Sequence, residues 1–120
     1  MKKALEATQK QFESDSGRTP EYLAWHKLFR REFTAFLKEM GATTIQIGKP
    51  NHFDMSGFFQ MVTGQMWYFR IEDIRWSKDT MLIRTAKGVH DFIGGPNQYI
   101  SLSDENKFKT RFKGAMICSV

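Results

Sequence analysis

The 120-residue sequence predicts an α+β fold: a two-layer sandwich of N-terminal helices packed on a sheet of four to six antiparallel strands, with a short C-terminal helix. Two observations predict this fold class. Apolar residues in the N-terminal third recur at steps of three and four, as on one face of a helix. From Thr43 onward the apolar period falls to two, and the connections between apolar runs are short, as in an antiparallel meander.

The first predicted helix is short and weakly amphipathic. Leu5, Thr8 and Phe12 lie at helical spacing in the segment from Lys2 to about Ser14, with good helix formers between them. A polar break at residues 15–18 follows and separates this segment from the next helix.

The long helix that comes next has the clearest signals in the chain. Thr19 can cap the first free amides, Pro20 suits the first helical position, and Gly41 fits the C-terminal end. A helix of about 20 residues with one apolar face is expected to pack across a sheet. The apolar stripe consists of Tyr22, Trp25, Leu28, Phe29, Phe33, Phe36, Leu37 and Met40.

Strand-like apolar runs follow the long helix. Thr63-Gly64 separates two of them and is a strong hairpin signal. In the run after this turn, Trp67 and Phe69 point to one face, whereas Tyr68 and Arg70 point to the other. The predicted strands are Thr43–Ile47, Phe58–Val62, Gln65–Ile74 and Thr80–Thr85, followed by shorter candidates at Val89–Ile93 and Gln98–Leu102.

The segment 104–113 has two interpretations. Ser103-Asp104-Glu105 at its start and Gly114 after it are typical of a capped helix, in which Phe108 and Phe112 meet one turn apart. The cap residues favour this helix. With a period of two, the segment would instead be a strand with one wholly basic face. That face would hold Lys107, Lys109, Arg111 and Lys113.

Length and composition indicate one domain, residues 1–120, in the cytoplasm. Hydrophobic residues make up 41% of the chain and charged residues 26%, as in globular proteins rather than disordered ones. The single cysteine, Cys118, cannot form an internal disulfide, which favours a reducing compartment. The chain has no signal-peptide pattern and no run near the ~18–20 apolar residues of a membrane-spanning helix. We therefore expect no membrane association.

The sequence has no motif that predicts catalysis, a metal or a cofactor. His26, His52 and His90 have no second ligand at a diagnostic spacing. Gly94-Gly95-Pro96 lacks the following helix and lysine of a nucleotide-binding loop. Cys118 has no nearby base to activate it. The expectation is a non-enzymatic protein with no cofactor and no metal.

The leading functional prediction is a binding module that engages nucleic acid, or a nucleic-acid-processing protein, through a basic and aromatic surface. The net charge of +5 favours polyanionic partners. The basic run of residues 107–113 contains no acid, and the surplus of aromatic residues in the sheet predicts a second patch. The predicted binding residues are Lys107, Lys109, Arg111, Lys113, Tyr68, Arg70 and Trp76.

Two other functions fit the same sequence. One is a protein inhibitor or adaptor, of the type carried by phages and mobile elements, that blocks a nucleic-acid-handling enzyme by protein–protein contact. The other is a small basic ribonuclease of toxin type, in which Arg84 and Lys87 would hold a phosphate and His90 would transfer a proton. An uncovered sheet face would also be compatible with a homodimer.

Overall fold

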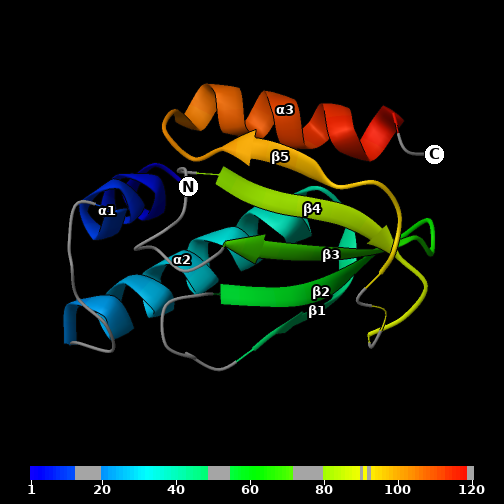
Figure 1. Ribbon diagram of the computed structural model, residues 1–120, viewed down its shortest axis with the longest axis horizontal. Helices are drawn as coiled ribbons and strands as arrows, with labels where there is room; N and C mark the ends of the chain where they lie inside the picture. The colour runs from blue at the N-terminus through cyan, green and yellow to red at the C-terminus, as the bar shows by residue number, and fades with distance from the viewer. Residues whose placement is uncertain (13–19, 49–54, 72–79, 90, 92, 119–120) are drawn as a thin grey trace.

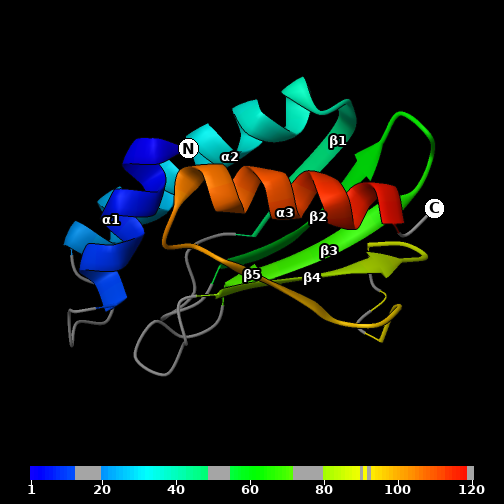
Figure 2. The same cartoon turned by 90° about the horizontal axis from the view of Figure 1, so that it is seen from above.

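The computed structural model describes residues 1–12, 20–48, 55–71, 80–89, 91 and 93–118, and these residues form three helices and five strands. All three helices lie on one side of the sheet, as Figure 2 shows, so the molecule has two layers. The predicted α+β fold is confirmed. The elements in Figure 1 are α1 (Lys2–Phe12), α2 (Pro20–Glu39), β1 (Ala42–Ile47), β2 (Met55–Met61), β3 (Met66–Ile71), β4 (Thr80–Ala86), β5 (Gln98–Ser101) and α3 (Glu105–Cys118).

The sheet is the antiparallel meander that the short connections predict. Its strand order is β1-β2-β3-β4-β5, so β1 and β5 form the two edges. The hairpin between β2 and β3 is confirmed, because Gly64 has a φ of 95° and its N–H donates to the carbonyl of Met61 over 2.8 Å. Gly57 lies within β2, where a Cβ would collide with the carbonyl oxygen of Gln46 on β1.

The predicted short strand Val89–Ile93 is not a strand at its described residues. The Asp91 side chain accepts hydrogen bonds from the backbone N–H groups of Lys87, Ile93 and Gly94, at 2.9, 3.1 and 2.9 Å. These bonds fold the segment into a tight loop after β4, because they use amides that a strand ladder would need. They also lower the pKa of the Asp91 carboxyl.

Phe33 on α2 contacts aromatic rings of both the sheet and α3. Its ring centroid lies 4.9 Å from that of Phe69 on β3 and 5.7 Å from that of Phe112 on α3. Phe33, Phe69 and Phe112 are all fully buried. The helix stripe and the inward face of the sheet, both predicted from periodicity, therefore meet at this residue.

Helix α1 is held to α2 by polar groups as well as by packing. The indole N–H of Trp25 donates to the hydroxyl of Thr8 over 2.8 Å, and that hydroxyl donates to the carbonyl of Ala4 over 2.7 Å. The Glu32 carboxylate accepts a hydrogen bond from the Ala4 N–H over 2.9 Å and so caps the start of α1. These contacts position a helix whose own propensity is marginal.

Segment 104–113 is helical, as its cap residues indicate, and the strand alternative is wrong. The Asp104 carboxylate accepts a hydrogen bond from the Asn106 N–H over 2.8 Å. The predicted end at Gly114 is also wrong, because α3 continues to Cys118. Phe108, Phe112 and Ala115 recur at steps of four and three and are all buried. Their packing against the core carries the helix through the glycine.

His26 on α2 is buried beside two aromatic rings. Its ring is 2% exposed, the ring centroids of Tyr22 and Trp25 each lie 6.3 Å away, and its Nε2 atom makes no hydrogen bond. Desolvation by burial, followed by the charge of Arg30, lowers the pKa of His26 below its ordinary value of 6.5. The folded protein therefore favours the neutral imidazole.

The free energy of unfolding is expected to fall as the pH drops below about 6.5, because the unfolded chain takes up a proton at His26 that the folded chain resists. The contribution of neutral His26 is fully present above this pH and is lost as the pH falls through the lowered pKa of the folded state. Denaturant unfolding at about pH 7.5 and about pH 5 measures the loss. His26→Phe is expected to lose less stability across this interval than the wild type, and equal losses would contradict this prediction.

Phe33→Ala is expected to lower the free energy of unfolding by about 3–5 kcal/mol, because it leaves a cavity where the sheet, α2 and α3 meet. Denaturant unfolding measures the change. Leu23→Ala on the same helix is the matched control, since Leu23 is 41% exposed and its truncation is expected to change stability by no more than about 0.5 kcal/mol. Similar losses in the two variants would show that Phe33 is not the centre of the core.

Candidate functional site

Helix α3 divides the predicted basic run between its two flanks. Successive residues of a helix are about 100° apart, so Lys107 and Arg111 share one flank and Lys109 and Lys113 share the other. The buried residues Phe108, Phe112 and Ala115 run between these flanks. Lys109 forms an ion pair with Glu105, in which its Nζ lies 3.6 Å from a carboxylate oxygen. The four cations therefore do not form one continuous basic face.

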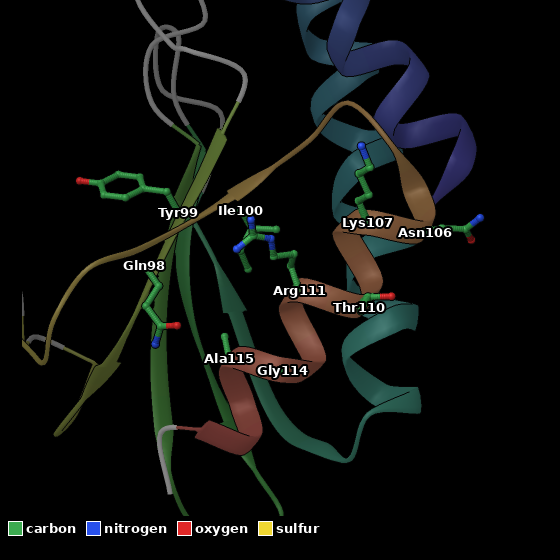
Figure 3. Close-up of a pocket in the computed structure, with 9 residues that line it drawn as sticks. All are labelled: Gln98, Tyr99, Ile100, Asn106, Lys107, Thr110, Arg111, Gly114 and Ala115. Atoms are coloured by element: carbon green, nitrogen blue, oxygen red, sulfur yellow. The ribbon is translucent and has the colours of Figure 1, made fainter.

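A groove of about 760 Å³ lies between α3 and the edge strand β5. Lys107 and Arg111 line it from the helix, and Gln98 and Ile100 line it from the strand. Figure 3 shows the Arg111 side chain extending from α3 toward Ile100, while Tyr99 projects away from the helix on the far side of β5. Gly114 contributes no side chain, and nothing lies within 4 Å of the position where its Cβ would be.

The lining of this groove has one sign of charge. It contains two cations, Lys107 and Arg111, and no aspartate or glutamate among the described residues. Both cations are exposed to solvent, whereas Ile100 and Ala115 are buried and form apolar patches of the wall. An anionic ligand with some apolar surface would complement this lining.

The main chain of β5 supplies a second element of the groove. The Thr85 carbonyl accepts a hydrogen bond from the Gly95 N–H over 3.0 Å, so the Thr85 main chain faces the β5 side of β4. Polar groups alternate sides along a strand, and Ile83 pairs with Gln98 and Met81 with Ile100. The N–H and C=O groups of Tyr99 and Ser101 therefore point away from β4, toward the open edge of the sheet.

The second predicted patch lies on the opposite face of the sheet from α3. Tyr68 and Arg70 project from the outward side of β3. Tyr68 is only 8% exposed, its ring centroid lies 5.1 Å from that of Phe58, and the Arg84 guanidinium stacks over its ring at 4.1 Å. Arg70 is exposed, and Trp76 lies outside the described residues. The two predicted patches are thus separated by the sheet.

Arg84 is a buried cation that the sequence interpretation treated as exposed. It is 5% exposed, its Nε donates to the carbonyl of Ile93 over 3.2 Å, and one terminal nitrogen donates to that of Asp91 over 3.5 Å. Its other terminal nitrogen is buried with no hydrogen-bond partner. Arg84 therefore links the loop after β4 to the Tyr68 ring by contacting both. Of its partners in the predicted ribonuclease set, Lys87 is exposed and His90 lies outside the described residues.

Sequence reasoning identified Lys107 and Arg111 but not the strand residues opposite them. Gln98 and Ile100 belong to a four-residue strand whose position at the sheet edge depends on the pairing order. Periodicity shows which residues share a face, but it does not show which strand lies at an edge or which helix runs beside it.

No group of three or more His, Cys, Asp and Glu side chains within the described ranges could hold a metal ion. No helix in those ranges is long and apolar enough to cross a membrane. Comparisons with known proteins found no matching protein family, no similar characterised protein and no similar solved structure.

Arg84→Lys is expected to lower the free energy of unfolding by about 2 kcal/mol, because an ammonium loses the planar stacking on Tyr68 and is more costly to desolvate than a guanidinium. Arg84→Met is expected to cost less than Arg84→Lys, since methionine fills similar space without burying a charge. Denaturant unfolding of both variants measures this order. A lysine variant as stable as the wild type would show that the guanidinium geometry contributes nothing.

Proposed function

We propose that this protein is a non-enzymatic binding module that recognises an acidic segment of another protein in the groove between β5 and α3. The observation that carries this proposal is the pairing of Lys107 and Arg111 on one helix flank, in a groove with no acidic residue in its described lining. Cations placed in this way attract carboxylates and exclude basic partners. The groove is also concave and partly apolar, as binding sites for peptide segments are.

The distribution of aromatic rings favours a protein ligand over bare nucleic acid. Proteins that bind single-stranded nucleic acid stack bases on exposed rings beside a basic track. Tyr68 is covered by Arg84. Tyr99, at 60% exposure, is the only exposed ring among the aromatic residues whose burial the structure describes, so there is no series of rings on which successive bases could stack. Because the basic run is also split between two flanks of α3, four cations are not aligned for a phosphate chain.

The cations of the groove are exposed to solvent, and this exposure determines how they contribute to binding. Exposed charges act over about one Debye length, roughly 8 Å at physiological ionic strength, and their contribution weakens as salt is added. They accelerate encounter and select the sign of the partner more than they raise affinity. Binding is therefore expected to be salt-dependent and of moderate strength. The expectation that the partner handles nucleic acid, as the target of an inhibitor or adaptor would, stays a prediction.

Lys107→Glu combined with Arg111→Glu is expected to weaken binding of a labelled poly-Glu peptide at least about tenfold, a loss of about 1.4 kcal/mol, because it places carboxylates in the groove. Fluorescence anisotropy measures the dissociation constant. Lys109→Glu combined with Lys113→Glu is the matched control: it makes the same change in net charge on the other flank of the same helix. It is expected to change the dissociation constant less than about threefold.

Two results would contradict the proposal. Equal losses in the two double variants would show that the peptide responds to overall charge rather than to the groove. Tighter binding of a single-stranded oligonucleotide of the same length and charge than of the peptide, at the same salt concentration, would favour the nucleic-acid function instead.

A further inference from the structure

We infer that the acidic segment binds as an added β-strand on β5, with acidic residues at alternate positions facing α3. This inference rests on the proposed function. Strand addition is a common way for sheet edges to capture extended peptides, since the main chain provides hydrogen bonds and alternate side chains provide specificity. Three features of the groove lead to this binding mode.

The first feature is the open edge of β5. The N–H and C=O groups of Tyr99 and Ser101 face away from β4, and a groove lined by Tyr99 separates β5 from α3. Such groups are a template for another strand. An incoming segment would satisfy them with main-chain hydrogen bonds, whatever its side chains.

The second feature is a match of spacing between α3 and an extended chain. Lys107 and Arg111 are four residues apart, which separates them by about 6 Å along the helix. Alternate residues of a strand lie on the same face about 6.6 Å apart. Since α3 runs back beside β5 (Figure 1), acidic residues at positions i and i+2 of an added strand would face these two cations.

The third feature is the different chemistry on the two faces of β5. Ile100 is turned toward α3, whereas Tyr99 projects from the opposite face and is 60% exposed (Figure 3). The intervening residues of an added strand would therefore lie beside the Tyr99 ring. Aromatic and β-branched residues pair well across neighbouring strands, so the ligand is expected to alternate acidic residues with β-branched or aromatic ones.

The other edge of the sheet is less suited to such a ligand. A groove also lies between α2 and β1, and Arg30 and Lys38 line it, but its volume is about 260 Å³. The pairing of β1 with β2 is irregular between Ala42 and Thr44. Irregularities of this kind twist an edge and hinder the addition of a strand.

The experiment uses two labelled ten-residue peptides of identical composition, one with Glu and Thr alternating and one with all Glu residues grouped together. The alternating peptide is expected to bind the wild-type protein at least about fivefold more tightly, because only its carboxylates share one face of a strand. Tyr99→Pro is expected to weaken its binding at least about tenfold, since proline removes the outward N–H. Tyr99→Val, which keeps that N–H, is expected to cost less than about threefold.

Amide hydrogen exchange in the wild-type protein provides a test that does not depend on a variant folding. The amides of Tyr99 and Ser101 are expected to become protected when the alternating peptide is added. The amides of Gln98 and Ile100, which face β4, are expected to be protected already. Peptide-induced protection on β1 instead of β5 would overturn the inference.

The outcomes separate this inference from the proposed function. If Tyr99→Pro binds the alternating peptide as the wild type does while the Lys107→Glu, Arg111→Glu variant does not, strand addition is wrong and the acidic-segment site stands. If neither variant changes binding, both are wrong. If sedimentation shows a dimer that Tyr99→Pro dissociates without any peptide, the edge belongs to a second copy of the chain and the inference is overturned.

Discussion

The contact between Phe33 and the two elements beside it is the constraint on which the rest of the structure depends. Its ring lies against Phe69 in the sheet and Phe112 in α3 at once, with centroid distances of 4.9 and 5.7 Å. Because Phe112 of α3 packs against this residue of α2, the two helices must lie on the same face of the sheet. That arrangement places α3 along β5 and leaves the opposite face of the sheet to a small cluster around Phe58 and Tyr68.

The same packing determines the direction of the groove cations. Lys107 and Arg111 each precede a buried phenylalanine, Phe108 and Phe112, by one residue. With both phenylalanines held in the core, a rotation of about 100° per residue places both cations on the flank that faces β5. The core therefore fixes the position of Lys107 and Arg111 although it contains neither of them.

Periodicity predicted the order of the elements and their buried faces, because a period of two residues follows from strand geometry and a period of 3.6 residues from helix geometry. It failed where contacts between segments distant in the sequence determine whether a side chain is exposed and which residues lie together. Tyr68 alternates as an outward residue, yet Arg84, which also binds the loop after β4, covers its ring. The cations of residues 107–113 would share one face of a strand, but they are divided between two flanks of the helix that begins after Asp104. The groove between β5 and α3 could not be predicted, because its position depends on β5 being an edge strand.

The shortness of β5 limits what its edge can contribute. Four residues offer an added strand only the outward groups of Tyr99 and Ser101. Each such hydrogen bond contributes about 1 kcal/mol net, which is less than the cost of ordering a flexible segment. Main-chain pairing would therefore align a ligand and supply part of its affinity, while Lys107 and Arg111 would select an acidic ligand and speed its encounter. A partner without carboxylates at the matching spacing would dissociate quickly. A short edge next to two cations would therefore make the proposed site selective and its complexes reversible.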